Sequence, residues 1–271
     1  MIFITASLVL YHNDPKDYEA AISSFLKGCD GIIYVIDSSS QRLKSQFFST
    51  PRVNYIFVGR NLGFGAAHNL AISRLPNLSK AHLILNPDII FDEHVLGYLF
   101  SKLEANDDIG IMMPKVLYPN GNLQRLCKLL PTPIDLIFRR FIPLSYFRNA
   151  LNRRYELEKL PQDFPSDVPS LSGCFLFIKT DLLKKIGGFD ERYFMYMEDV
   201  DLVRRGGDFS RTVYDPNVSV VHNYCKGSYK NAKLLMYHLR SAIRYFNKWG
   251  WVFDRTRRHR NKIILKNICR H

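Results

Sequence analysis

Cysteine is scarce in this sequence and forms no recognisable pair. The five cysteines are odd in number and widely spaced, and none occurs in a Cys-x-x-Cys pair. This pattern gives no support to a zinc site or a dithiol redox couple, and it fits a reducing compartment best. The five are Cys29, Cys127, Cys174, Cys225 and Cys269.

Long apolar runs are missing as well. The chain begins MIFITASLVLY, which has no basic region before it and is too short to span a bilayer. The sequence therefore predicts neither a signal peptide nor a transmembrane helix, and we expect the protein to stay in the cytosol. There is no internal repeat and no low-complexity tract, which argues against a solenoid or a disordered chain.

The composition of the chain is sufficient for a full hydrophobic core. The 271 residues are 46% hydrophobic and 13% aromatic, and this length lies at the upper end of what one domain usually holds. We expect one compact α/β body with a C-terminal extension.

Acidic residues are few relative to basic ones. The 38 lysines and arginines exceed the 25 aspartates and glutamates, and the formal net charge is +13. Nucleic acid, anionic lipid and diphosphate-bearing substrates are all suitable partners for such a charge. The sequence has no helix-turn-helix, RRM or zinc-finger signature. A non-enzymatic nucleic-acid-binding protein stays open as an alternative, favoured by salt-sensitive binding to duplex DNA without sugar-nucleotide hydrolysis.

The basic residues gather in two segments. Residues 137–154 interleave five arginines with aliphatic and aromatic side chains and contain no acid, and residues 255–270 carry seven lysines and arginines. Such a mixture is typical of a segment that enters a lipid headgroup region while its arginines bind phosphates. We expect contact with an anionic membrane surface; a pair of solvated helix faces is the alternative.

The first half of the chain alternates between strand and helix patterns. Short β-branched runs are separated by stretches with apolar residues at helical spacing, which predicts a parallel sheet covered on both faces. Ligands of such sheets bind beyond the carboxyl ends of the strands, where Asp37, residues 61–69 and Asp88 would gather. The predicted strands are 3–10, 32–36, 53–58 and 82–85, and the predicted helices are 15–27 and 65–74.

The second half is more varied. The run Tyr118-Pro119-Asn120-Gly121 predicts a hairpin turn, and a proline-rich linker covers 161–169. We expect strands at 172–178, 212–214 and 219–221, and helices from 181, over 197–205, over 232–248 and in the terminal basic run. This organisation divides the chain into a main domain, 1–230, with halves 1–114 and 115–230, and a basic helical extension, 231–271.

The triplet Asn86-Pro87-Asp88 directly follows an apolar strand. This position places a carboxylate at the binding edge of the sheet, on backbone stiffened by proline. A carboxylate there can hold Mg²⁺ or Mn²⁺, which in turn binds a diphosphate. The alternative is an aspartate that begins the next helix.

Four motifs occur in a fixed order. They are residues 61–69 (NLGFGAAHN), 86–88 (NPD), 172–174 (SGC) and 187–202 (GGFDERYFMYMEDVDL). Together they resemble the signature of glycosyltransferase family 2, especially its bacterial rhamnosyltransferases. The resemblance extends from residue 1 to about residue 245, and the ordered set is far more specific than any single motif.

The resemblance implies a GT-A fold, a Rossmann-like and mostly parallel sheet flanked by helices. It also implies a nucleotide-sugar donor, a divalent cation (Mg²⁺ or Mn²⁺) and inversion at the anomeric carbon. Asp37 would bind the nucleoside, Asp88 would ligate the metal, and Asp199 would be the catalytic base. His222 matches a histidine near the donor diphosphate or the metal. In the 61–69 motif, the donor-binding residues would be Asn61, Gly63, Gly65 and Asn69, with both glycines allowing close backbone approach to the nucleotide sugar.

Chemistry supports these roles independently. An acceptor hydroxyl is a poor nucleophile near neutral pH, so a carboxylate such as Asp199 must take its proton, which contributes roughly 10² to 10⁴ in rate. The departing diphosphate gains negative charge, which a metal at Asp88 together with Arg204 or Arg205 would stabilise. The remaining expectations concern the acceptor sugar, whose binding we assign to Glu198, Asp201 and Tyr196.

The sequence departs from the family at two places. Ser38 follows Asp37 where asparagine is common, and Asn86 replaces the first carboxylate of an Asp-x-Asp motif, which leaves the metal with one protein carboxylate. The Gln-x-x-Arg-Trp motif of processive members is absent, so we expect transfer of a single sugar.

Two other enzyme classes fit less well. A dinucleotide-dependent dehydrogenase needs its glycine-rich loop after the first strand and ahead of the acidic residue, whereas Gly63 and Gly65 come after Asp37. A sugar-phosphate nucleotidyltransferase needs a glycine-rich basic loop after the first strand, which is missing. The resemblance to bacterial rhamnosyltransferases implies a transferase that moves L-rhamnose from dTDP-L-rhamnose for a bacterial surface polysaccharide such as O-antigen or capsule. The basic aromatic segment 137–154 favours a lipid-linked saccharide as the acceptor. The enzyme would act at the inner face of the cytoplasmic membrane; a UDP- or GDP-sugar donor is the alternative.

Overall fold

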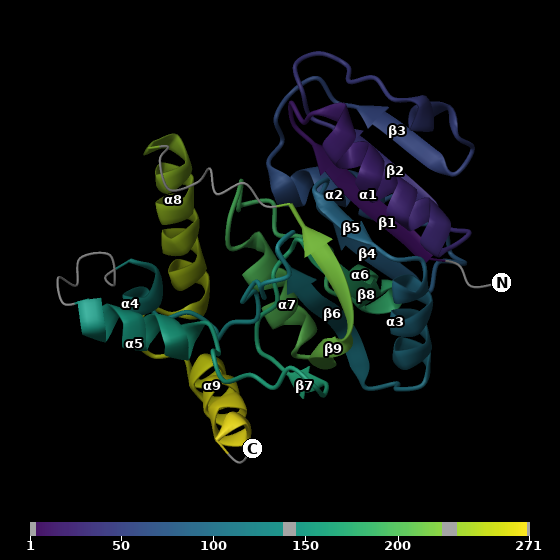
Figure 1. The fold of residues 1–271 in the computed structure, drawn as a ribbon. Helices are drawn as coiled ribbons and strands as arrows, with labels where there is room; N and C mark the ends of the chain where they lie inside the picture. The colour runs from purple at the N-terminus through teal and green to yellow at the C-terminus, as the bar shows by residue number, and fades with distance from the viewer. Residues whose placement is uncertain (1–3, 138–144, 224–231, 270–271) are drawn as a thin grey trace.

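A single mixed sheet of nine strands forms the centre of the protein, and helices cover both of its faces (Figure 1). The computed structural model describes residues 4–137, 145–223 and 232–269. The strand order is β3-β2-β1-β4-β8-β6-β9-β5, with β7 paired to β9 off this path. This architecture is the α/β sheet with flanking helices that the sequence predicts.

The N-terminal half is a parallel unit. Its elements are β1 (Ile4–Leu10), α1 (Pro15–Gly28), β2 (Ile32–Asp37), the short 3-10 helix η1 (Gln46–Ser49), β3 (Val53–Phe57), α2 (Phe64–Ile72) and β4 (Ala81–Leu85). The order β3-β2-β1-β4 is parallel throughout. Leu10 pairs with Asp37 and Leu8 pairs with Leu85, so the carboxyl ends of β1, β2 and β4 lie at one edge of the sheet.

The second half adds antiparallel strands. Its elements are β5 (Ile89–Phe91), α3 (His94–Glu104), β6 (Ile109–Leu117), α4 (Pro133–Leu136), α5 (Ser145–Tyr155), β7 (Ser166–Asp167), β8 (Phe175–Lys179), α6 (Thr180–Lys185), α7 (Glu198–Gly206) and β9 (Arg211–His222). Strand β8 is antiparallel to both of its neighbours, β4 and β6, whereas β6 and β9 are parallel. The parallel pairing therefore holds for the first four strands and for β6 with β9, and the remaining pairs are antiparallel.

Two predictions for this half need correction. The strands predicted at 212–214 and 219–221 belong to one strand, β9, which shifts register between Asp215 and Ser219. The turn at Tyr118 is confirmed by a hydrogen bond from the Gly121 N–H to the Tyr118 carbonyl at 2.9 Å. The returning chain, however, forms only an isolated bridge between Leu117 and Leu123 rather than a hairpin strand.

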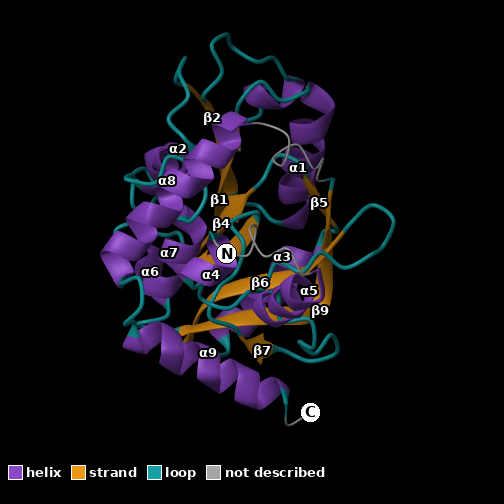
Figure 2. Cartoon of the chain, turned by 90° about the vertical axis from the view of Figure 1, so that its left-hand side faces the viewer, coloured by secondary structure: helices purple, strands orange, loops and turns teal. Residues whose placement is uncertain are grey.

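Two long helices end the described chain, α8 (Ala232–Trp249) and α9 (Arg255–Ile268). Both lie on the side of the molecule away from β3 (Figure 1), and α9 lies next to β7 (Figures 1 and 2). They are fastened to α7 by buried charges, because Arg204 forms two hydrogen bonds, of 2.7 and 2.8 Å, with the carboxylate of Asp254. Asp201 of α7 likewise accepts hydrogen bonds from Lys248 and Trp249 of α8.

The two basic segments, 137–154 and 255–270, differ in what the structure describes of them. Residues 138–144 of the first lie outside the described residues. In the second, the buried Arg257 donates to backbone carbonyls of Pro131 and Gly250, and Arg260 donates to the Arg204 carbonyl and to Asp208. Part of the terminal charge therefore serves the fold. Across the described ranges, every helix is too short or too polar to cross a bilayer.

Candidate functional site

Four segments meet beyond the carboxyl end of β4. The turn after β4 binds the start of β8 through the Asn86 N–H and the Cys174 carbonyl, at 2.9 Å. It also binds the end of β9, because the Asn223 N–H donates to the Asp88 carbonyl at 2.8 Å. The fourth segment, the first turn of α7, joins through Asp199. Residues 86–88, 172–174, 198–199 and 222–223 thus form one site.

Asp88 and His222 face one another in this site. The distance from Asp88 Oδ1 to His222 Nε2 is 3.2 Å. On the other side of the ring, His222 Nδ1 lies 2.9 Å from Gln124 Oε1. The Gln124 amide nitrogen donates to the carbonyls of His222 and Leu117, so its oxygen must face Nδ1. An amide oxygen only accepts hydrogen bonds, so Nδ1 carries the proton and Nε2 is the nitrogen that faces Asp88.

This arrangement suits a cation. A carboxylate oxygen and a neutral imidazole nitrogen at 3.2 Å repel unless a positive charge lies between them, as a proton on Nε2 or as a metal ion. Oxygen and imidazole nitrogen are suitable donors for Mn²⁺, and the Gln124 hydrogen bond orients the ring as outer partners of metal ligands do. Within the described ranges, no cluster of three or more acidic, histidine or cysteine side chains has the geometry of a metal site.

Asp199 is held by backbone donors. Its Oδ2 accepts a hydrogen bond from the Gly173 N–H at 2.9 Å, and its Oδ1 accepts one from the Val200 N–H at 2.8 Å. A side chain at position 173 would collide with Asp199, because a Cβ there would lie 3.0 Å from the Asp199 Cβ. Burial raises the pKa of the adjacent Cys174 thiol to about 12, and the charges of both Asp88 and Asp199 add to the rise. The two carboxylates therefore flank the same dipeptide.

Glu198 precedes Asp199 and is buried. Burial raises the pKa of the Glu198 carboxyl to about 8, and the charge of Asp199 adds to the rise. Its Oε2 has no hydrogen-bond partner in the described structure. Glu198 is thus mainly protonated at neutral pH.

Asp37 lies at the same sheet edge but in a different setting. The carboxyl ends of β2 and β4 are separated by β1, which corresponds to about 10 Å. The buried Asp37 carboxylate accepts hydrogen bonds from Tyr55 at 2.5 Å and from the N–H groups of Ser39 and Leu43 at 2.9 Å. Burial alone would raise the pKa of Asp37, but these hydrogen bonds hold it below its usual value. Asp37 therefore shapes the loop after β2, and the site proper joins Asp88 with Asp199.

The 61–69 motif packs against the protein itself. Gly63 needs its φ of 81°, and a Cβ there would lie 2.1 Å from the Phe194 carbonyl oxygen. A Cβ on Gly65 would lie 2.8 Å from the Phe189 side chain. Both glycines thus allow close approach of residues 189–194, and the approach of their backbone to the nucleotide sugar stays a prediction. Asn69 binds both the N–H and the carbonyl of Phe189, and Asn61 accepts from the Gly63 N–H.

Asp201 and Arg204 also have internal partners. Asp201 is fully buried and pairs with Arg205 at 2.8 Å and with Lys248 at 2.7 Å. Arg204 is 2% exposed and pairs with Asp254. The expectation that Asp201 binds the acceptor and Arg204 the donor is not supported, because both side chains point into the packing of α7 against α8 and α9. Arg205 is occupied as well, by Asp201 and by backbone carbonyls.

The segment before α7 has unusual backbone geometry. Tyr196 and Met197 both have a φ of 68°, in the left-handed region that side chains other than glycine rarely adopt. The Tyr196 ring lies 5.4 Å from the ring of His238 on α8, and the Ser241 hydroxyl donates to the Met195 carbonyl at 2.8 Å. Helix α8 therefore supports the segment that delivers Glu198 and Asp199 to the site.

Sequence reasoning missed Gln124 and the role of residues 173 and 174. Gln124 lies 98 residues from its partner His222, and nothing in its local pattern distinguishes it from a surface glutamine. Gly173 belongs to the recognised motif, but only the fold reveals that its N–H binds Asp199. These contacts are long-range, so spacing along the chain gives no signal for them.

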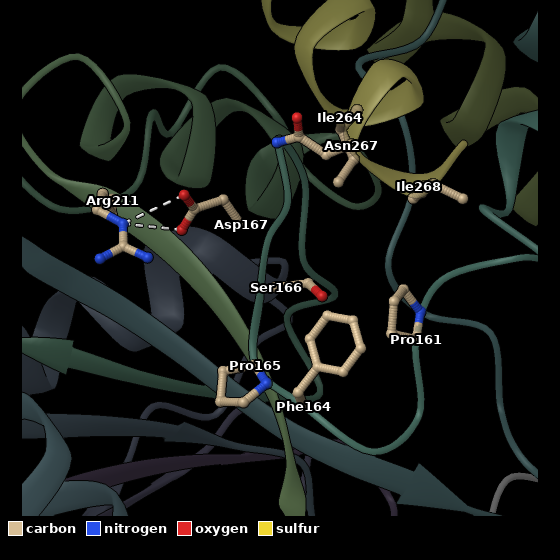
Figure 3. A pocket seen from close by; sticks show the side chains of 9 residues that line it. All are labelled: Pro161, Phe164, Pro165, Ser166, Asp167, Arg211, Ile264, Asn267 and Ile268. Carbon is tan, nitrogen blue, oxygen red and sulfur yellow. Dashed lines mark hydrogen bonds and ion pairs between the residues drawn. The ribbon is translucent and has the colours of Figure 1, made fainter. Parts of the chain in front are cut away.

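A separate cavity of about 280 Å³ lies between the 161–167 segment and α9 (Figure 3). Its walls include Phe164, Ile264 and Ile268, and its cation, Arg211, is paired with Asp167. Its lining shares no residue with the four segments of the site. It is therefore not the place where the predicted chemistry would occur.

Comparison with known proteins places these observations in context. No family model matches the chain. The chain is 31% identical over 185 residues to N-acetylglucosaminyl-diphospho-decaprenol L-rhamnosyltransferase of Mycobacterium tuberculosis, a match covering 64% of this chain and 59% of the relative. It is 27% identical over 197 residues to rhamnosyltransferase WbbL of Escherichia coli, covering 68% and 69%. The chain thus spans about three fifths of the length of the mycobacterial relative.

Solved structures show the same fold at low identity. GalNAc-T7 with UDP, GalNAc and Mn²⁺ has a TM-score of 0.61 and 12% identity, over 92% of this chain and 50% of that chain. The mannosyltransferase PcManGT of Pyrobaculum calidifontis, in complex with GDP-Man and Mn²⁺, has a TM-score of 0.54 and 16% identity, over 89% and 64%. The comparisons confirm the resemblance that the sequence indicated: this chain is similar to bacterial rhamnosyltransferases and has the GT-A fold, consistent with glycosyltransferase family 2.

Proposed function

We propose that this protein is an inverting glycosyltransferase that moves one sugar from a nucleotide-activated donor to an acceptor hydroxyl. The observation that carries the proposal is the meeting of Asp88, His222 and Asp199 at the carboxyl edge of the sheet, where the segments bearing them bind one another directly. This edge is where ligands of open α/β sheets bind. Two enzymes with the same fold were solved with a sugar nucleotide or nucleotide and Mn²⁺.

Asp88 and His222 are the residues that would hold a divalent cation. When bound, the cation neutralises the negative charge that develops on the departing diphosphate. Asn86, which takes the place of a second carboxylate, binds through its backbone to Cys174. The protein contribution to the metal is therefore one carboxylate and one imidazole whose orientation Gln124 fixes.

Asp199 is the proposed catalytic base. Two backbone N–H groups orient its carboxylate, and a carboxylate can accept the proton of an acceptor hydroxyl. Glu198 and Tyr196 flank it and are the proposed acceptor contacts. The proposal gives Asp201, Arg204 and Asn69 positioning roles, since each is bound to another part of the protein.

The choice of donor and acceptor in this proposal is supported by the names of the relatives. The mycobacterial relative is named for L-rhamnosyl transfer to a diphosphate-linked lipid saccharide, and the Escherichia coli relative is a rhamnosyltransferase. By similarity, we propose dTDP-L-rhamnose as the donor and a lipid-linked saccharide at the inner face of the cytoplasmic membrane as the acceptor, in the synthesis of a bacterial surface polysaccharide.

A donor screen tests this proposal. The purified protein is incubated with dTDP-, UDP- and GDP-sugars in the presence of Mn²⁺ or Mg²⁺, and thermal stabilisation and release of nucleoside diphosphate are measured. We expect dTDP-L-rhamnose to give the largest effect in both assays, and EDTA to abolish release. Preference for a UDP- or GDP-sugar would correct the donor, and absence of release with every donor would refute the activity.

A further inference from the structure

The outer face of α8 is divided lengthwise into an apolar half and a basic half. Leu235, Met236, Leu239 and Ile243 are between 39% and 52% exposed, and their spacing of one, four and eight residues places them on one stripe of the helix. Three basic residues lie side by side along the neighbouring stripe: Lys233, Arg240 and Arg244, all exposed.

The apolar stripe continues into the turn after α8. The Trp251 ring packs against Phe246 with a centroid distance of 5.1 Å, and its indole nitrogen donates to Asn247, one turn along α8 from Ile243. Val252 and Phe253 follow and are 69% and 88% exposed. The surface formed by these residues from Leu235 to Phe253 is called here the α8 ridge, and its helical part, from Leu235 to Trp249, is about 21 Å long at 1.5 Å per residue. Apolar side chains this exposed and this contiguous mark a contact surface.

A basic pocket adjoins the end of the α8 ridge. The pocket has a volume of about 640 Å³ and lies between α5 and α9, with Val252 in its wall. Its lining includes four exposed cations, Arg154, Arg258, Lys262 and Lys266. The buried Arg257 also lines it but is bound to backbone carbonyls, and its acid, Asp254, is bound by Arg204. The ridge and the pocket together offer apolar side chains beside a concentration of positive charge, which is complementary to an anionic lipid surface.

The opposite face of α8 contacts the catalytic segment. Tyr237 packs against Phe194 at 4.7 Å, His238 against Tyr196, and Ser241 binds Met195. These three residues of α7's leading segment lie within five positions of Asp199. One helix thus presents its outer face to solvent and its inner face to the segment that carries the proposed base.

We infer that the α8 ridge and the adjoining basic pocket dock this protein on an anionic phospholipid bilayer, with the ridge entering the headgroup region and the pocket binding lipid phosphates. This docking rests on the proposed function, in which the bilayer holds the lipid-linked acceptor beside α8. The α8 ridge and the basic pocket are then the surface through which the protein contacts the membrane. That surface differs from the 137–154 segment that the sequence predicts, because the ridge comes from α8 and the α8–α9 turn, and only the pocket wall includes a residue of α5.

Vesicle sedimentation tests the inference. Wild-type protein is mixed with vesicles of phosphatidylcholine alone or with an equal part of phosphatidylglycerol, at low and high salt. We expect binding to the anionic vesicles that weakens at high salt. The paired substitution Leu239→Glu with Ile243→Glu, and separately Phe253→Ser, should weaken binding by at least about tenfold. The matched control is Leu78→Glu, a leucine that is 75% exposed in the loop before β4, which should bind as wild type does.

Two further measurements make the result decisive. The substitutions Arg258→Glu with Lys262→Glu should remove the difference between anionic and neutral vesicles. Release of nucleoside diphosphate from the donor without vesicles should be unchanged in all ridge variants; its absence in wild type would refute the proposed function and leave the docking surface standing. Unchanged vesicle binding by the ridge variants would overturn the inference. It would also be overturned if wild type did not bind vesicles and the ridge variants changed from dimer to monomer. That second result would identify the ridge as a contact between two copies of the chain.

Discussion

At the residue scale, the site depends on single hydrogen bonds that set the state of a titratable group. Gln124 fixes the tautomer of His222, and the Gly173 N–H orients Asp199. Glu198 lacks such a partner at Oε2, and it is the carboxyl whose pKa is raised. The neighbouring residues 198 and 199 therefore have different surroundings: the Glu198 carboxyl is buried with a raised pKa, and the Asp199 carboxyl is held by backbone N–H groups.

The role of Gln124 is testable through metal affinity. Replacing it in Gln124→Leu removes the acceptor that holds His222 Nδ1–H, so the ring loses its fixed orientation. We expect Mn²⁺ affinity, measured by calorimetric titration in the presence of nucleoside diphosphate, to fall by about 10- to 100-fold. Gln162→Leu is the matched control, because Gln162 is hydrogen-bonded to Tyr214 away from the site. Equal Mn²⁺ affinities in the two variants would exclude His222 as an oriented ligand.

Glu198 predicts a pH effect on stability. Its pKa is about 8 in the folded protein against a usual value of 4.5, so the folded state keeps a proton that the unfolded chain loses over this range. The stabilising effect is complete below about pH 4.5 and is lost as the pH rises through 8. Because one pKa unit corresponds to about 1.4 kcal/mol, Glu198→Gln should exceed wild type in unfolding free energy by at least about 1 kcal/mol near pH 9.

The measurement is urea unfolding of both proteins across this pH range. The difference between variant and wild type should grow from about pH 4.5 to about pH 8 and level off at higher pH. Glu104→Gln, at the exposed end of α3, should show no such growth. A difference for Glu198→Gln that is independent of pH would mean that this carboxyl ionises at its ordinary value.

At the element scale, strand and helix periodicity predicted most of the first half. The strands β1 to β4 and the helices α1 and α2 lie within one or two residues of their predicted bounds. Helix α3 was not predicted, although Val95, Leu96, Leu99, Phe100 and Leu103 show its buried face at helical spacing. Strand β9 was predicted as two strands, 212–214 and 219–221, which lie on either side of Pro216 and Asn217. The chain instead bulges there, with the Asp215 carboxylate accepting the Asn217 N–H, and the strand then continues.

The junction of α7 with α8 and α9 predicts a stability effect. Asp254→Asn leaves the buried guanidinium of Arg204 without its negative partner, while the asparagine can still cap α9. Breaking a buried ion pair on one side costs about 3–5 kcal/mol. Asp167→Asn, which breaks the exposed pair with Arg211, should cost no more than about 1 kcal/mol. Chemical unfolding of the two variants compares them directly, and equal losses would show that Arg204 and Asp254 do not fasten α9.

At the scale of the whole molecule, the order of elements and motifs along the chain was sufficient to predict the fold and the family resemblance. The long-range partners of individual side chains could not be predicted from the sequence. The carboxyl ends of β2 and β4 meet at one edge because the first four strands are parallel, and this follows from their alternation with helices. By contrast, Asn69 binds a backbone 120 residues away, and Asp201 and Arg204 are neutralised by residues that follow α8 or end it. Contacts between residues this far apart in the sequence decide whether a polar residue of a motif binds the substrate or stabilises the packing of the protein.

The same scale explains the basic composition. Of the terminal arginines, Arg257 and Arg260 bind the interior of the fold, while the cations around the pocket beside α9 stay near the surface. The distribution of charge thus separates into a structural part and a part available to an anionic partner. Net charge alone did not predict this division.

Transfer by the Asp199→Asn variant is the most direct test of the account. Wild type and variant are given dTDP-L-rhamnose, Mn²⁺ and a lipid-linked saccharide, and the extended saccharide is quantified by mass spectrometry together with donor affinity. The account predicts that product formation falls by about 10² to 10⁴ while donor affinity stays within about twofold. Product formation by the variant at the wild-type rate would contradict Asp199 as the base and, with it, the site assembled at the edge of the sheet.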